Sequence, residues 1–239
     1  MTEFANLTLP SFPAGYRALV MGASGSIGAA FCALLSQDAR CAQVVTLHRQ
    51  SQPLINFDDE ASIAAAAAHF APLGKFHLVI VATGLLHTGQ FTPEKRLADL
   101  SYAQLEQTFR TNTLGPAMVL RHFAPLLDTQ RSVLAVLSAK VGSIEDNRLG
   151  GWYSYRASKA ALNMLLKTAA IEVKRSNPQA VLVALHPGTV SSHLSQPFRG
   201  AEIGRKPLDA ASDMLGVLDG LSADHSGRFF AYNGAQLPW

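Results

Sequence analysis

Two side chains with complementary proton chemistry stand four residues apart in the second half of the chain. Tyr155 and Lys159 fall within Tyr153–Lys174, a segment whose apolar residues have helical spacing. Residues four apart lie on one face of a helix, so the ammonium is expected beside the phenol. A neighbouring ammonium stabilises a phenolate and is expected to lower the pKa of the tyrosine. Such a phenol can exchange a proton with a carbonyl or an alcohol near neutral pH.

A glycine-rich turn near the start of the chain could hold a phosphate group. It reads Gly22-Ala-Ser-Gly25-Ser-Ile-Gly28 and stands between an apolar segment and a segment with helical spacing. Glycines let the backbone approach a pyrophosphate, and the N–H groups of a helix N-terminus supply hydrogen bonds and a positive dipole. The turn therefore predicts a dinucleotide site formed by Gly22, Ser24, Gly25, Ser26, Ile27 and Gly28.

The residues after the second apolar segment favour NADP over NAD as the dinucleotide. An acidic residue at this place would accept hydrogen bonds from the ribose hydroxyls and select NAD. The chain instead has Leu47-His48-Arg49, and the Arg49 guanidinium can pair with a 2′-phosphate. Alternatively, Arg49 is only a solvated loop residue. It would then not select NADP, and NAD would remain possible as the cofactor.

The elements that position these residues alternate between short apolar segments and longer segments with helical spacing. The predicted strands are apolar on nearly every residue, which indicates burial on both faces. They are Arg17–Met21, Gln43–Leu47, His77–Ala82, Ser132–Leu137, Ala180–Leu185 and Arg228–Tyr232. The predicted helices are Ile27–Leu35, Ala61–Phe70, Asp99–Phe123 with an interruption near Gly115-Pro116, and Tyr153–Lys174.

This alternation predicts an α/β fold: a Rossmann-type, doubly wound parallel sheet with helices on both faces, in three layers. Such folds bind ligands beyond the carboxyl ends of their strands. The 239 residues are 48% hydrophobic and 15% charged, which excludes a disordered chain. We expect a single dinucleotide-binding domain over residues 1–239, with an N-terminal extension at 1–15 and a candidate substrate loop at 189–206.

Several classes of function are disfavoured by what the sequence does not contain. The net charge of +3 includes no block of Lys or Arg, so nucleic acid is not expected as a partner. No apolar run reaches the roughly 18 residues of a membrane span. Neither His-Glu-x-x-His nor Cys-x-x-Cys occurs, so no metal site is expected. Two cysteines and an N-terminus unlike a secretion signal predict a cytoplasmic protein.

Four motifs in order resemble the short-chain dehydrogenase/reductase family. They are the Gly22–Gly28 turn, Asn112 in a long helix, Tyr155-x-x-x-Lys159, and His186-Pro187-Gly188-Thr-Val190. The segments Gly142-Ser-Ile…Gly150-Gly151-Trp-Tyr-Ser-Tyr155 and Gly227-Arg-Phe-Phe…Pro238-Trp239 resemble a narrower group, the C-factor-like and sniffer-like carbonyl reductases. The resemblance extends from about residue 16 to residue 239.

The resemblance implies a role for each matching residue. Tyr155 would be the acid/base, Lys159 would hold the nicotinamide ribose, and Asn112 would organise a water-filled proton relay to Lys159. Further contacts to the cofactor would come from Ala82, Thr83, Gly84, Pro187, Gly188 and Val190. The contact to adenine, which the family usually makes with an aspartate, is assigned to Asn56, with Asp58 and Asp59 as the alternatives.

The substrate-holding serine of the family is the clearest departure. The family places it three residues before the glycine that follows the fifth strand. If this glycine is Gly142, the position is occupied by Ala139. Ser138 and Ser143 flank it, and Ser138 is favoured because it stands at the carboxyl end of the strand. For Ser138 to face the site, the strand must end or bulge there, because adjacent strand residues point to opposite faces.

Together these features predict an oxidoreductase that transfers a hydride between NADP(H) and a small carbonyl or alcohol substrate, with Tyr155 as acid/base. The resemblance also implies a homodimer or homotetramer assembled through the helices that carry Asn112 and Tyr155. The alternative is a dinucleotide-binding sensor or signalling protein of the C-factor type with little turnover. Ala139 keeps this alternative open, whereas intact Asn112, Tyr155 and Lys159 argue against it.

Overall fold

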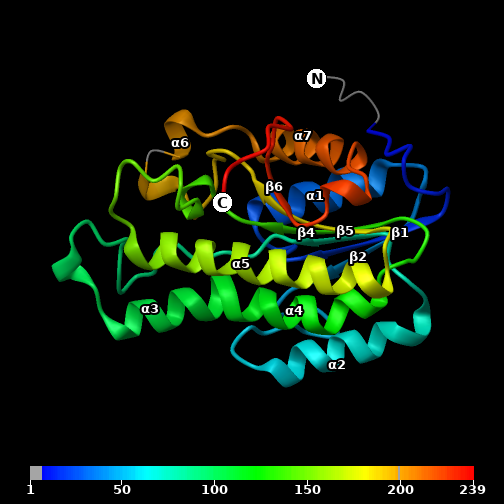
Figure 1. Cartoon of the computed structure of the whole chain (residues 1–239), viewed down its shortest axis with the longest axis horizontal. Helices are drawn as coiled ribbons and strands as arrows, with labels where there is room; N and C mark the ends of the chain where they lie inside the picture. Colours follow the sequence, from blue (N-terminus) through cyan, green and yellow to red (C-terminus); the bar gives the residue numbers. More distant parts are fainter. Residues whose placement is uncertain (1–6, 199) are drawn as a thin grey trace.

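Six parallel strands form the central sheet, in the order β2-β1-β3-β4-β5-β6 (Figure 1). The computed structural model describes residues 7–198 and 200–239. Residues 1–6 of the predicted extension and residue 199 of the predicted substrate loop therefore lie outside the described residues. The strands are β1 (Tyr16–Met21), β2 (Cys41–Leu47), β3 (Leu78–Val81), β4 (Ser132–Leu137), β5 (Ala180–His186) and β6 (Arg228–Ala231).

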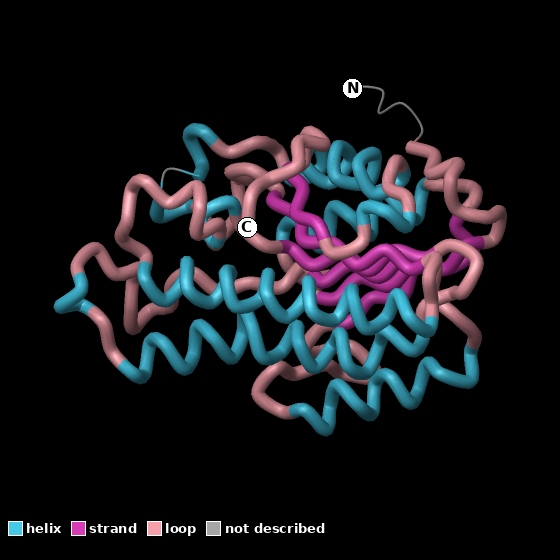
Figure 2. Tube along the Cα trace, viewed as in Figure 1, coloured by secondary structure: helices cyan, strands magenta, loops and turns pink. Residues whose placement is uncertain are grey.

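Helices cover both faces of this sheet, which confirms the predicted three-layer α/β fold (Figure 2). One face packs against α1 (Ser26–Gln37) and α7 (Pro207–Asp219). The other packs against α2 (Glu60–Phe70), α4 (Gly115–Phe123) and α5 (Tyr153–Ser176). Alternate residues of the buried strands supply the two cores, since Leu134 and Val136 of β4 face α5 whereas Val133 and Ala135 face α1 and α7.

The predicted helix Asp99–Phe123 is in fact two helices with a wider turn between them. α3 (Tyr102–Phe109) is followed by a π-helical turn, Arg110–Leu114, and only then by α4. The interruption thus lies before Gly115-Pro116, which belong to the first turn of α4. Proline is tolerated at this place because the N–H groups of a first turn have no partner within the helix, so none is lost. The π turn carries Asn112, consistent with the frequent use of such turns at functional sites.

Two further features differ from the sequence-based expectation. α7 was not predicted, although its buried residues Ala211, Met214, Leu215 and Leu218 recur at helical spacing against α1. The described part of the N-terminal extension belongs to the core, because Leu9 and Phe12 are fully buried beside α1 and α7. The described part of the loop at 189–206 contains a 3-10 helix, Gln196–Phe198, and a short α-helix, α6 (Gly200–Ile203). Within the described residues, no helix has the length and apolar character needed to cross a membrane.

The first turn of α1 lies unusually close to the end of β1. A Cβ atom added at Gly28 would lie 2.1 Å from the carbonyl oxygen of Gly22. Gly22 itself has a φ of +80°, and a Cβ there would lie 2.9 Å from the carbonyl oxygen of Ala82. Glycine at both places lets the helix N-terminus sit directly on the turn after β1, where its N–H groups face the carboxyl ends of the strands.

We expect Gly28→Ala to destabilise the protein and Gly216→Ala to stabilise it. Both glycines lie within helices, where alanine is intrinsically favoured by about 0.5–1 kcal/mol. An added Cβ at Gly216, in α7, would meet nothing within 4 Å, whereas at Gly28 it would meet backbone. Overpacking of this kind costs about 1–3 kcal/mol. Chemical unfolding of both variants tests this, and equal shifts in their free energies of unfolding would contradict it.

Candidate active site

A cleft of about 670 Å³ lies at the carboxyl ends of β1, β2, β3 and β4, where the fold predicts a ligand site. Residues far apart in the sequence meet along its wall. The predicted site residues among them are Gly22, Ser24, Gly25, Ser26, Ile27, Arg49, Asn56, Ala82, Thr83, Gly84, Ser138, Tyr155, Lys159 and Pro187.

Unpaired hydrogen-bonding groups gather at the glycine-rich part of this wall. α1 has Gly25 at its N-cap, with no side-chain cap and no acidic residue in its first turn. In the described residues, the N–H groups of Ser24, Ser26 and Ile27 therefore have no hydrogen-bond partner. The Thr83 hydroxyl, from the loop after β3, is also buried without a partner. These groups fit the pyrophosphate of a dinucleotide, which would supply acceptors for all of them.

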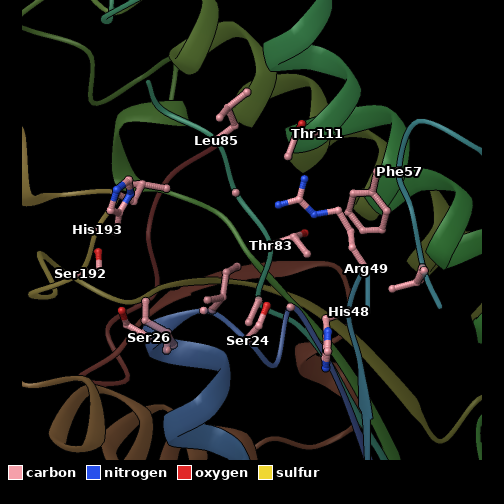
Figure 3. A pocket seen from close by; sticks show the side chains of 18 of the residues that line it. Ser24, Ser26, His48, Arg49, Phe57, Thr83, Leu85, Thr111, Ser192 and His193 are labelled. Carbon is pink, nitrogen blue, oxygen red and sulfur yellow. The ribbon is translucent and has the colours of Figure 1, made fainter. Parts of the chain in front are cut away.

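Arg49 lies at one end of the cleft, in the loop that follows β2. Figure 3 shows its side chain beside Phe57, with the guanidinium extending toward Thr111 and His48 below. No hydrogen bond or ion pair engages the guanidinium within residues 7–198 and 200–239. A free guanidinium over the cleft fits a phosphate group, which it can bind with two hydrogen bonds.

The structure separates the three candidates for the adenine contact. Asn56 and Asp58 both line the cleft, and the side-chain oxygen of Asn56 accepts a hydrogen bond from the Asp58 N–H at 3.1 Å. The Asp58 carboxylate lies 3.8 Å from the Arg110 guanidinium. Asp59 instead caps α2, because it accepts a hydrogen bond from the Ala61 N–H at 3.0 Å. Asn56 and Asp58 thus lie on the cleft wall, where a ligand could contact them, whereas Asp59 does not line the cleft.

Tyr155 and Lys159 come together as predicted on one face of α5, at the end of β4. The Lys159 ammonium lies 5.9 Å from the centroid of the Tyr155 ring. It donates a hydrogen bond of 2.8 Å to the main-chain carbonyl of Leu137, the last residue of β4. The lysine is only 2% exposed. The ammonium is thus held at a fixed place by the strand end, next to the phenol and the cleft.

The predicted lowering of the tyrosine pKa is wrong for this arrangement. Burial raises the pKa of Tyr155 to about 12, because the phenolate would lose hydration. Burial also lowers the pKa of Lys159 to about 8, because the ammonium loses hydration. The lysine donates to Leu137 rather than to the phenol, so it does not offset the cost of charging the tyrosine. The phenol is therefore fully protonated at neutral pH.

Asn112 is fully buried and does not line the cleft. Its side-chain oxygen accepts a hydrogen bond from the Leu85 N–H at 2.7 Å, and its amide nitrogen donates to the Leu85 carbonyl at 2.8 Å. The same nitrogen donates to the Ser158 hydroxyl at 3.1 Å. Asn112 thus joins the π turn to the loop after β3 and to α5, next to Lys159. Its role in a proton relay stays a prediction.

Three other predicted cofactor residues also lie off the cleft wall, and each has a local structural role. Gly28 lets the first turn of α1 pack against the main chain of Gly22, as described above. Gly188 has a φ of +74°, and an added Cβ would lie 2.8 Å from the ring of Tyr232. Val190 is 4% exposed and pairs with Arg205 in an isolated bridge that closes the loop at 189–206.

Both candidate serines are buried, and both donate their hydroxyl hydrogen to another protein group. β4 ends at Leu137, as the assignment of Ser138 requires, and Ser138 reaches the cleft. However, its hydroxyl donates to the Asn163 side-chain oxygen at 2.7 Å. The Ser143 hydroxyl donates to the Trp239 main-chain carbonyl at 3.0 Å and does not line the cleft. A contact from Ser138 to substrate would require its hydroxyl to turn away from Asn163.

Several cleft residues were not predicted from the sequence. Ser192, His193 and Leu194 come from the expected substrate loop, so the region was predicted although the residues were not. The remainder come from other loops, from the α3 region and from the end of β4: His48, Ile55, Phe57, Leu85, Thr88, Gln107, Thr111 and Leu137. Their residue types carry no local signal, because only the packing of α3 and α5 beside the strand ends brings them to the cleft. Over the described residues, no group of three or more His, Cys, Asp or Glu could hold a metal ion.

Comparison with known proteins agrees with this geometry. The family model for short chain dehydrogenases matches residues 16–202. The C-signal protein of Myxococcus xanthus is 38% identical over 145 residues, which are 60% of this chain and 83% of that protein. NADPH-bound carbonyl reductase from chicken fatty liver superposes with a TM-score of 0.81 at 24% identity, covering 95% of this chain and 96% of that chain. Carbonyl reductase Sniffer of D. melanogaster superposes with a TM-score of 0.80 at 20% identity, covering 94% and 99%.

The family model covers most of the chain, from β1 to α6. The chain therefore belongs to the short-chain dehydrogenase family. Both narrower groups named by the sequence resemblance, C-factor-like and sniffer-like, are represented among its relatives and structural neighbours. The family consists of dinucleotide-dependent oxidoreductases, and the cleft described above lies where its fold binds the dinucleotide.

We expect Lys159→Met to change how the free energy of unfolding depends on pH. The pKa of Lys159 is about 8 in the folded chain, against 10.5 as its ordinary value. Between these values the unfolded chain binds more protons, so the stability of the wild type rises with pH. The destabilisation by the buried charge is complete below pH 8 and absent above pH 10.5, a difference of roughly 3 kcal/mol.

Urea unfolding of the cofactor-free protein across this pH range measures the effect. The wild type should gain stability relative to Lys159→Met as the pH rises from 8 to 10.5, and the two curves should run parallel below pH 8. Lys174→Met, at an exposed position near the end of the same helix, is the matched control and should follow the wild type throughout. A constant offset between wild type and Lys159→Met would show that Lys159 is not buried as a charge.

Proposed function

We propose that the chain is an NADPH-dependent reductase of a small carbonyl compound, with Tyr155 as the proton donor. One observation carries the proposal: a protonated phenol, a buried ammonium and an uncapped glycine-rich helix N-terminus line the same cleft. The phenol can donate the proton that carbonyl reduction needs at the oxygen, the ammonium lies beside the phenol, and the helix N-terminus is a binding site for the cofactor diphosphate.

Different groups along the cleft would hold the different parts of the cofactor. The N–H groups of Ser24, Ser26 and Ile27 would bind the pyrophosphate, and Arg49 would bind the 2′-phosphate of NADP. Asn56 would contact the adenine, and Lys159 the nicotinamide ribose. When bound, NADPH supplies the hydride. The NADPH-bound chicken carbonyl reductase, which shares this fold, supports NADP as the cofactor.

The proton chemistry of the site suits the reduction of a carbonyl group. Because its pKa is about 12, Tyr155 holds its proton at neutral pH and can donate it to the oxygen of a reduced carbonyl. Lys159 stands beside it, with its ammonium anchored on the Leu137 carbonyl and 5.9 Å from the centroid of the Tyr155 ring. Asn112 would link Lys159 to solvent through the proposed relay.

A carbonyl oxygen at Tyr155 would lack the second hydrogen-bond donor that the family obtains from serine at the position of Ala139. Ser138 is the nearest candidate in the sequence, provided that its hydroxyl exchanges Asn163 for substrate. This departure favours carbonyl compounds that are reactive enough to be reduced with only one hydrogen-bond donor, Tyr155, at the carbonyl oxygen. The identity of the substrate within that class depends on the loop at 189–206.

A second candidate function, a dinucleotide-binding sensor with little turnover, is favoured by two observations. The chain resembles the C-signal protein of Myxococcus xanthus, and both candidate serines are held by other protein groups. NADPH oxidation with a panel of aldehydes, ketones and quinones distinguishes the two functions. Turnover with a member of the panel supports the reductase. Tight NADPH binding without turnover on any member would contradict the reductase and support the sensor.

The proposed assembly is a homodimer or homotetramer formed through α4 and α5. These helices border a second hollow of about 640 Å³ on the surface, and α5 exposes Met164, Leu165 and Ile171. Apolar side chains gathered on exposed helices are typical of association surfaces. A cytoplasmic location, inferred from the sequence, stays a prediction.

We expect Tyr155→Phe to lower kcat by at least 10²-fold and to leave NADPH affinity nearly unchanged. The ring and its packing remain, and only the proton donor is lost; general acid catalysis contributes about 10²–10⁴-fold. Tyr153→Phe, on an exposed face two residues earlier, is the matched control and should keep wild-type turnover. Steady-state kinetics and NADPH titration measure both quantities. A Tyr155→Phe enzyme with near-wild-type kcat would remove Tyr155 from the mechanism.

We expect Arg49→Ala to weaken NADPH binding about ten- to a hundredfold and to change NADH binding little. A charge-assisted hydrogen bond contributes roughly 1.5–3 kcal/mol, and this contact exists only for the 2′-phosphate. Arg96→Ala, which removes an exposed guanidinium paired with Asp99, controls for the change in net charge. Fluorescence titration of both cofactors gives the two affinities. Equal losses for NADPH and NADH would show that Arg49 does not bind the 2′-phosphate.

A further inference from the structure

The start of α5, two residues before Tyr155, is built in an unusual way. Three successive residues have left-handed backbone conformations: Gly150 with φ 63°, Gly151 with φ 66° and Trp152 with φ 53°. Glycine adopts this conformation readily, but a tryptophan does so only when its surroundings hold it there. Trp152 is also the N-cap of α5, and it provides no side-chain cap for the helix. Another group must therefore hold this helix start.

That group is Glu94, a buried residue 60 positions before Ser154 in the chain. Its main-chain carbonyl accepts a hydrogen bond from the Trp152 N–H at 2.5 Å. Its carboxylate accepts one from the Ser154 N–H at 3.2 Å and another from the Ser154 hydroxyl. Glu94 is 2% exposed. A carboxylate that binds free N–H groups at a helix N-terminus acts as a cap, and its charge complements the helix dipole.

The contacts of Glu94 lead directly to the reacting residue. Ser154 precedes Tyr155, so the carboxylate holds the peptide from which the phenol projects. The Trp152 ring meets the Tyr155 ring edge-on, with centroids 6.1 Å apart. The same ring contacts Phe198 of the loop at 189–206, with centroids 5.3 Å apart. Trp152 therefore contacts both the Tyr155 ring and the predicted substrate loop, in a backbone conformation held by Glu94.

We propose that Glu94 is a positioning residue for carbonyl reduction, acting through Ser154 and Trp152. It fixes the position of the main chain from which Tyr155 projects at the start of α5, and it holds the Trp152 ring in contact with both Tyr155 and Phe198. Glu94 itself is not on the cleft wall, so it touches neither cofactor nor substrate. The proposal rests on the proposed function, because it assigns the purpose of the arrangement to the reaction of Tyr155.

The same helix start has a second anchor, which lets Glu94 be changed without unfolding it. The Arg156 guanidinium donates hydrogen bonds to the carbonyls of Gly150 at 3.2 Å, Gly151 at 2.9 Å and Val141 at 3.1 Å. This anchor holds the loop before α5 independently of Glu94. The cofactor diphosphate site, on the turn after β1, shares no residue with either anchor. Loss of the Glu94 carboxylate should therefore affect the placement of Tyr155 and spare NADPH binding.

The first test compares Glu94→Ala with Glu94→Gln, which keeps an amide oxygen as acceptor. We expect Glu94→Ala to lower kcat at least tenfold, with the NADPH dissociation constant within twofold of the wild type. Glu94→Gln should recover most of the rate, to within about threefold. Glu106→Gln, at an exposed position of α3, controls for the lost charge and should match the wild type. Parallel losses of kcat, NADPH affinity and thermal stability in Glu94→Ala would overturn the proposal, because they indicate a purely structural role.

The second test does not depend on turnover. The chain has two tryptophans, so Trp239→Phe leaves Trp152 as the sole tryptophan fluorophore. In this background, Glu94→Ala should shift Trp152 emission to longer wavelength and increase its quenching by acrylamide, and Glu94→Gln should do neither. Unchanged emission and quenching in Glu94→Ala would overturn the proposal. If the wild type reduces no carbonyl, the proposed function fails, and the fluorescence still decides whether Glu94 positions Trp152.

Discussion

The arrangement of the cleft depends on one buried charge, the Lys159 ammonium, and on the carbonyl that receives its hydrogen bond. A lysine that is 2% exposed loses almost all of its hydration, and the Leu137 carbonyl at the end of β4 replaces part of it. This requires α5 to lie against the strand end. Gly142 permits the approach, since a Cβ there would lie 2.7 Å from the Lys159 Cβ. The same contact sets Tyr155, one helical turn earlier, at the mouth of the cleft.

Two parts of the cleft are built on different principles. Backbone groups dominate at the turn after β1, where glycines bring the N-terminus of α1 against the strand ends and leave its N–H groups free. Side chains dominate around Tyr155 and Lys159, which are fixed by packing and by hydrogen bonds between distant segments. The diphosphate site is therefore built from the main chain of the fold, whereas the reaction site is built from side chains that changes in the loops can alter.

Local patterns were sufficient to predict what depends on local sequence. The strands were recognised because they are apolar on both faces, and the glycine turn and the Tyr155–Lys159 pair because their spacing has a direct geometric meaning. The features that were missed depend on contacts between distant segments. The π turn at Asn112, the raised pKa of Tyr155 and the hydroxyl of Ser138 bound to Asn163 all follow from tertiary packing. α7 had a readable helical pattern, and its prediction would have needed no more than the sequence.

The central claim is that this cleft transfers a hydride from NADPH to a carbonyl carbon while Tyr155 supplies the proton. The most direct measurement uses NADPH deuterated at the transferable C4 position, incubated with the wild type and a panel of aldehydes, ketones and quinones, with the products examined by mass spectrometry. The account predicts an alcohol or hydroquinone product from at least one member of the panel, with one deuterium on the former carbonyl carbon of each alcohol formed from an aldehyde or ketone. Saturable binding of the deuterated cofactor with neither an alcohol nor a hydroquinone formed from any member of the panel would contradict it.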